Sequence, residues 1–138
     1  MKKLFLLVLL LTGLGFRTDL LAQSEPVLYF CERYDPDKGE IGVSDRYTTG
    51  YLTVMVKCDN ALGLSSVHIQ FNKYNYRTGE FDYYKKFHYT VETDMNYIFF
   101  AKNDESDLKF EEPGFYRVFL LDDNDDTVAS ALIEIVER

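Results

Sequence analysis

Basic residues are scarce in this sequence. Its 138 residues include 15 Lys and Arg against 23 Asp and Glu, which gives a formal net charge of −8. Proteins that bind nucleic acid in general need a basic surface that releases counterions from phosphates, and docking on anionic lipid needs basic side chains as well. The composition therefore predicts no nucleic-acid partner and no electrostatic attachment to a membrane.

An apolar run long enough to cross a membrane is also absent. The longest run, residues 4–16, is shorter than the roughly 20 residues that span a bilayer as a helix. It follows Lys2 and Lys3 and precedes the small residues Ala22 and Ser24, which is the layout of a secretory signal peptide. We predict a signal peptide at residues 1–24, with cleavage after Ser24 or, nearly as well, after Ala22.

The predicted leader implies an exported protein, either periplasmic or extracellular, with one domain at residues 25–138 and no membrane span after cleavage. An uncleaved amphipathic anchor is the alternative.

Cysteine is scarce too: Cys31 and Cys58 are the only two in the chain. In an exported protein such a pair invites a disulfide, yet each lies in an apolar run and suits a buried thiol equally well. The sequence leaves both alternatives open.

The domain has no window with the period of an amphipathic helix, and from residue 27 onward apolar and polar residues alternate with a period close to two. Val67, Ile69 and Phe71 share one face of a predicted strand. In the next strand, Phe81, Tyr83, Phe87, Tyr89 and Val91 are expected to share the apolar face. The expected strands are residues 27–33, 51–58, 66–74, 81–92, 96–103, 114–122 and 127–137, and the expected long loops are 35–50 and 104–113. Seven short strands separated by turns predict an all-β, antiparallel sandwich.

A short motif opens the sixth expected strand. Glu112, Gly114, Tyr116 and Val118 alternate with other residues after a Glu-Pro-Gly corner. This spacing resembles the tyrosine corner of immunoglobulin-type domains, and the resemblance implies that the Tyr116 hydroxyl bonds backbone in the preceding loop while its ring closes one end of the core. Val118 stands where antibody domains carry a cysteine, and the chain has no tryptophan. The sequence is therefore similar to the immunoglobulin-like or fibronectin-like modules of exported bacterial proteins.

Residues that carry catalytic chemistry are few. The two histidines, His68 and His88, fall on the strand faces opposite the apolar residues, and neither is expected beside a candidate nucleophile. Ser65 and Ser66 have no catalytic motif around them. Two histidines and two cysteines without ligand spacing indicate no metal site. We therefore predict no enzyme activity, no cofactor and no metal, and instead a non-catalytic interaction or structural module.

Two acidic clusters leave a second function class open. Asp35, Asp37 and Glu40 form one cluster, and residues 122–126 form the other. Oxygen ligands of this kind suit calcium, but Asp and Asn are equally typical of turns, where they bind their own backbone. A calcium-dependent or carbohydrate-binding accessory domain is therefore the alternative function.

The hairpin of residues 66–90 differs from the rest of the chain in charge and composition. It holds four basic residues against two acidic ones, together with five tyrosines, a composition typical of recognition surfaces. Strand propensity and protection of a sheet edge explain the same residues without any partner. We predict a protein or cell-envelope component as the partner, or weak self-association, through Tyr74, Tyr76, Arg77, Tyr84, Lys85, Lys86 and His88.

Overall fold

The structure, a computed structural model, describes residues 25–138. The predicted signal peptide, with its cleavage sites, lies outside the described residues. The described part of the chain contains strands and turns and no helix. No helix able to span a membrane occurs within residues 25–138.

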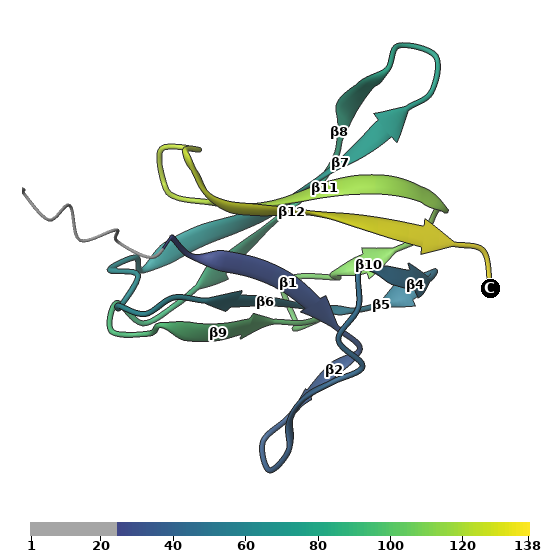
Figure 1. Cartoon of the computed structure of the whole chain (residues 1–138). Helices are drawn as coiled ribbons and strands as arrows, with labels where there is room; N and C mark the ends of the chain where they lie inside the picture. Colours follow the sequence, from purple (N-terminus) through teal and green to yellow (C-terminus); the bar gives the residue numbers. More distant parts are fainter. Residues whose placement is uncertain (1–24) are drawn as a thin grey trace, which may run out of the picture.

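Seven long strands and the short strand β4 form the body of the domain in two sheets (Figure 1). One sheet has the order β1-β6-β9, built from β1 (Val27–Cys31), β6 (Thr53–Lys57) and β9 (Tyr97–Phe100). The other has the order β4-β12-β11-β7-β8, with β4 (Arg46–Thr48), β7 (Ser66–Asn75), β8 (Glu80–Thr90), β11 (Gly114–Leu121) and β12 (Thr127–Val136). Every pairing is antiparallel except that of β4 with β12.

The strand order is that of an immunoglobulin domain. The first, second and fifth long strands share one sheet, while the third, fourth, sixth and seventh share the other. Immunoglobulin domains likewise place their first, second and fifth strands in one sheet and their third, sixth and seventh in the other. The fourth long strand, β8, instead lies beside the third, as the added strand of the variable type does. The prediction of an antiparallel sandwich of about seven strands is therefore confirmed.

The core lies between the two sheets and follows the predicted alternation. Val54 and Val56 of β6 face Ile69 and Phe71 of β7 across the core, and Val118 of β11 completes this layer; all five are fully buried. Each strand contributes every second residue because successive side chains point to opposite faces. At about 25 cal/mol per Å² of apolar surface, this layer supplies much of the hydrophobic stabilisation.

The prediction that residues 35–50 form a loop is wrong in part. It holds the end of β2 (Arg33–Asp35), β3 (Gly39–Ile41), β4 and the start of β5 (Gly50–Tyr51). The β2–β3 hairpin lies against the outer face of the three-stranded sheet, where Tyr34 stacks on Phe99 with ring centroids 4.6 Å apart. Tyr29 of β1 also donates a hydrogen bond to Glu40 of β3. Met55, which points away from the main core, lies between Tyr29 and Phe99 in the sheet and is 0% exposed.

The second predicted loop, residues 104–113, contains the two-residue strand β10 (Lys109–Phe110), which pairs with β5. Neither β5 nor β10 is long enough to show a period of two, so the sequence pattern gives no signal for them.

The prediction of which β8 side chains face the core is wrong for the first half of the strand, because the strand contains a β-bulge. Phe71 lies opposite Lys85 but Asn72 lies opposite Tyr83, so Tyr84 is an extra residue. An extra residue moves all side chains beyond it to the other face. Tyr83 is accordingly 65% exposed, while Tyr84 packs against the core beside Tyr116, with ring centroids 5.5 Å apart.

The register of β1 with β6 excludes the disulfide. Cys31 lies opposite Thr53, whereas Cys58 follows Lys57, which lies opposite Val27. The two cysteines are thus at opposite ends of the strand pair, roughly 17 Å apart at about 3.4 Å per residue, whereas a disulfide joins Cα atoms less than about 7 Å apart. Both are thiols, Cys31 buried and Cys58 partly exposed.

Candidate interaction surface

The predicted corner is present around Tyr116. Its hydroxyl donates a hydrogen bond of 2.6 Å to the backbone carbonyl of Glu112, and its ring is 0% exposed. The ring contacts Phe110 at 5.0 Å between centroids. Burial raises the pKa of Tyr116 because the phenolate would lose its water. Gly114 has a φ of +146°, which residues with a Cβ rarely adopt. The backbone conformation therefore explains why the motif has a glycine at this position.

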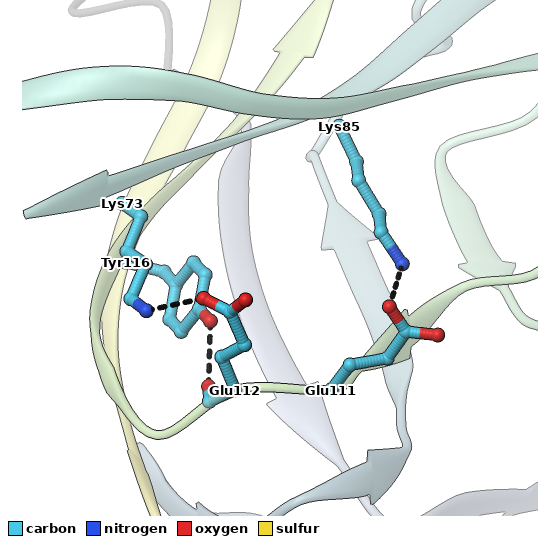
Figure 2. Close-up of polar contacts among 5 residues, drawn as sticks. All are labelled: Lys73, Lys85, Glu111, Glu112 and Tyr116. Carbon is cyan, nitrogen blue, oxygen red and sulfur yellow. Dashed lines mark hydrogen bonds and ion pairs between the residues drawn. The ribbon is translucent and has the colours of Figure 1, made fainter.

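Two ion pairs attach the 66–90 hairpin to this corner (Figure 2). Lys73 of β7 binds Glu112 with 2.6 Å between Nζ and Oε2, and Lys85 of β8 binds Glu111 at 2.9 Å. Exposed ion pairs contribute little stability singly. Together with the Tyr116 hydrogen bond, however, they fix the position of the loop at residues 111–113 relative to the hairpin.

Beyond this attachment the hairpin projects from the sandwich. Pairing of β11 with β7 ends at Lys73, whereas pairing of β7 with β8 continues to Asn75 and Glu80. Figure 1 shows the turn between β7 and β8 extending away from both sheets. The distal segment, residues 74–83, is therefore a two-stranded arm, and we call it the hairpin tip.

A groove with a volume of about 470 Å³ lies between the hairpin tip and the corner loop. Its rim carries Tyr76 and Tyr83, which are 71% and 65% exposed. Tyr76 also borders a neighbouring hollow of about 390 Å³ that extends toward the end of β12. The groove is lined by Lys73, Tyr74, Asn75, Tyr76, Arg77, Asp82, Tyr83, Tyr84 and Pro113.

Aromatic contacts hold the side chains of the hairpin tip in place. Tyr74 packs edge-on against Tyr76 at 5.1 Å and against Phe81 at 5.3 Å between ring centroids. The guanidinium of Arg117, on β11, lies 5.4 Å from the centre of the Phe81 ring. In the turn, the Asn75 side chain accepts a hydrogen bond from the backbone N–H of Arg77. These contacts fix the positions of the tip side chains relative to one another.

The structure divides the predicted contact residues into two groups. Tyr74, Tyr76, Arg77 and Tyr84 come together around the groove. Tyr84 was predicted to lie opposite the apolar face, and the bulge makes that prediction wrong: its ring packs on Tyr116 and only part of it reaches the groove.

The other three predicted contact residues lie outside the groove. Lys85 is engaged with Glu111, and Lys86 binds Asp125 of the turn between β11 and β12 at 2.5 Å. His88 lies further along β8, with its Nε2 atom 2.8 Å from the Ser66 hydroxyl. Of the four basic residues of the hairpin, Arg77 is the one without an ion pair among residues 25–138. The basic character predicted for this surface is therefore largely neutralised.

Sequence reasoning did not assign Lys73, Tyr83 or Pro113 to the site. Tyr83 was placed on the wrong face because alternation cannot reveal a bulge. From the sequence, Lys73 counted only as one of the four basic residues of the hairpin, although its ion-pair partner Glu112 belongs to the corner motif. Pro113 reaches the groove only because the fold brings the corner loop beside the third and fourth long strands. No local sequence pattern predicts this proximity.

The acidic clusters are organised as turns. The Asp35 carboxylate accepts hydrogen bonds from the N–H groups of Asp37 and Lys38. The Asp122 carboxylate accepts them from Asn124 and Asp126. Within the described chain, no three His, Cys, Asp or Glu side chains are grouped so as to hold a metal ion. Asp35 and Asp122 therefore bind the backbone of their own turns, as Asp residues commonly do.

Ser66 and His88 contradict the expectation that neither histidine lies beside a nucleophile. The register places Ser66 and His88 at neighbouring positions of paired strands, and they are hydrogen-bonded. Nucleophilic catalysis also needs a group that orients the base. Among the described residues no carboxylate contacts His88, so the pair alone gives no reason to assign hydrolytic chemistry.

Comparisons with known proteins add one likeness. No family model matches the chain, and no curated protein matches it. Among solved structures, it is similar to the crystal structure of an immunoglobulin-like protein from Pseudomonas aeruginosa, with 11% sequence identity, 83% of this chain and 99% of that chain covered, and a TM-score of 0.46. The class of the domain is defined by its own strand order and tyrosine corner, which are those of an immunoglobulin-like β-sandwich.

Proposed function

We propose that residues 25–138 form an exported, non-catalytic binding module that contacts another protein or a cell-envelope component through the groove at the hairpin tip. The observation that carries this proposal is the groove itself. It is a concave surface of about 470 Å³ on a projecting arm, bordered by the exposed rings of Tyr76 and Tyr83.

Aromatic rings held in this way are suited to binding. Tyrosine supplies a large contact area and a hydroxyl while losing little conformational entropy. The Tyr74 ring limits the motion of Tyr76, and the ion pairs of Lys73 and Lys85 hold the two walls of the groove together. A preorganised surface binds more tightly because less ordering accompanies association.

The internal ion pairs change the electrostatic expectation. Since Lys73, Lys85 and Lys86 already bind carboxylates, attraction of an acidic partner depends mainly on Arg77. Affinity should therefore fall only modestly as salt rises, because a single exposed charge is readily screened while aromatic burial is not.

Export is supported by the leader pattern at residues 1–24. Its test is to express the whole chain in a bacterium, fractionate the cells and sequence the N-terminus of the recovered protein. An N-terminus at residue 23 or 25 in the periplasm or medium supports export, and recovery of the uncleaved chain from the cytoplasm contradicts it.

The binding test compares two variants with the unaltered domain, each immobilised and exposed to solubilised envelope fractions. The tip variant combines Tyr76→Ser and Arg77→Ser, both in exposed positions. The matched control combines Asp123→Asn and Asp126→Asn in the acidic turn, which leaves the Lys86–Asp125 pair intact. Loss of a captured component with the tip variant alone supports the groove, whereas loss with the turn variant alone identifies the acidic turn as the contact.

A carbohydrate ligand is the second candidate. The groove combines four tyrosines with the polar side chains of Asn75, Arg77 and Asp82, and sugar rings suit aromatic faces flanked by hydrogen-bonding groups. Affinity electrophoresis in gels containing a panel of cell-wall polysaccharides separates the two. Retardation that the Tyr76→Ser and Arg77→Ser changes abolish would identify a polysaccharide as the partner.

A further inference from the structure

The two histidines of the chain lie directly opposite each other. The sequence contains two histidines, separated by twenty positions, and the pairing of β7 with β8 places His68 opposite His88. Their ring centroids are 5.2 Å apart and their planes are inclined by 60°. Both rings lie on the outer face of the five-stranded sheet, since the alternate residues Val67 and Ile69 are buried in the core.

Each ring has a nitrogen without a partner. The Nε2 atom of His88 is 2.8 Å from the Ser66 hydroxyl, which leaves Nδ1 open. The Nδ1 atom of His68 is buried and has no hydrogen-bond partner among residues 25–138. A buried ring nitrogen without a partner is costly, so it marks a place where a ligand would be stabilising. The Ser66 contact resembles the outer hydrogen bond that orients metal-binding histidines.

The separation of the rings suits one ion between them. A zinc–nitrogen bond of about 2.1 Å puts the metal roughly 3.2 Å from the centre of each ring, and two rings at a tetrahedral angle are then about 5.2 Å apart. The observed centroid separation equals this value. The strand pair therefore holds the two rings at the separation that binding of one ion by both requires.

The charges around the pair are nearly balanced. Lys86 lies on the same face, one alternate position from His88, but its ammonium is bound to Asp125 at 2.5 Å. Asp123 and Asp125, both in the turn between β11 and β12, act on His68 electrostatically, as Lys86 does with the opposite sign. An added cation thus meets two carboxylates and one ammonium that is already paired.

We infer that His68 and His88 form a chelating site for a divalent transition-metal ion that prefers imidazole, such as nickel, copper or zinc. Two protein ligands leave the remaining coordination positions to water, so the site is more weakly binding than a closed structural site. The site lies toward the base of the hairpin, outside the groove, and does not depend on the proposed function. Sequence reasoning predicted no metal because the register that joins the two histidines is not visible in their spacing.

The test is calorimetric titration of residues 25–138 with nickel chloride and, separately, zinc chloride. We expect one ion per chain and a rise in the thermal midpoint with metal concentration, because an ion that binds only the folded state stabilises it. His88→Gln, at an exposed position, should weaken binding at least tenfold by leaving one imidazole, and His68→Gln should do the same.

Two comparisons make the result decisive. Cys58→Ser should bind nickel as the unaltered domain does, which separates the histidine pair from the partly exposed thiol. The copper complex should show two equivalent nitrogen ligands in its electron paramagnetic resonance spectrum, reduced to one in His88→Gln. Unchanged affinity in His88→Gln, or loss of binding in Cys58→Ser alone, would overturn the inference.

Discussion

Tyr116 is the residue on which the contacts of the corner converge. Its hydroxyl binds the Glu112 carbonyl, its ring packs on Phe110 and Tyr84, and the Lys73 ammonium lies 6.0 Å from its ring centre. Tyr116→Phe should lower the free energy of unfolding by about 1 kcal/mol, since one buried hydrogen bond is lost. Tyr116→Ala should lower it by roughly 3–5 kcal/mol, since a large buried ring leaves a cavity. Urea denaturation measures both.

Tyr83→Phe is the matched control for that prediction, because Tyr83 is 65% exposed. It should leave the midpoint and slope of the denaturation curve unchanged. A Tyr116→Phe variant as stable as the unaltered domain would mean that the corner hydrogen bond contributes nothing.

Cys31 offers a second prediction at the level of one residue. It is 0% exposed, and burial raises the pKa of its thiol, so the reactive thiolate is scarce as well as inaccessible. In a Cys58→Ser variant, which leaves one thiol, labelling reagent should modify no cysteine in the native state and one after denaturation. Rapid native labelling would contradict the buried position of Cys31.

At the level of elements, the bulge in β8 and simple alternation make opposite predictions about which tyrosine faces the core. Alternation places Tyr83 in the core, whereas the structure places Tyr84 against it. Tyr84→Ala should therefore cost about 2–3 kcal/mol of unfolding free energy through lost packing. Tyr83→Ala should stay within about 0.5 kcal/mol, as surface changes usually do. Denaturation of the two variants side by side decides which face each residue occupies, and the reverse order would contradict the bulge.

The same element shows what the sequence could and could not predict. The seven long strands were predictable because each carries several alternating residues bounded by turn residues, and Tyr116 was predictable because its motif is local. The bulge at Tyr84 and the pairing of His68 with His88 depend on register, which is set by the packing of whole strands. The groove depends on Pro113 from a distant loop, and the parallel pairing of β4 with β12 involves only three residues.

At the level of the whole molecule, buried tyrosines predict how stability depends on alkaline pH. Burial raises the pKa of Tyr47 and of Tyr89 to about 12, and raises that of Tyr116 as well. In the unfolded chain tyrosine ionises near pH 10. Since the folded pKa is the higher one, this contribution to stability is complete below about pH 10 and is lost as pH rises toward about 12.

Tyrosinate absorbance and circular dichroism, followed together in an alkaline titration, check this prediction. Tyr47, Tyr89 and Tyr116 should ionise only well above pH 10, together with loss of the sheet signal. Ionisation of all tyrosines in one step near pH 10, with the sheet intact, would contradict the buried positions.

The projecting hairpin has a consequence for how such a domain can diverge. Past Lys73, the tip pairs only within itself and no longer with β11. Residues 74–83 can therefore be exchanged with little effect on the remainder of the sandwich, while residues 66–71 remain constrained by the core. Among homologues we expect a tip that varies in sequence and length on a conserved base. The exposed surface of the tip would in that way change without the folding of the sandwich having to be re-optimised.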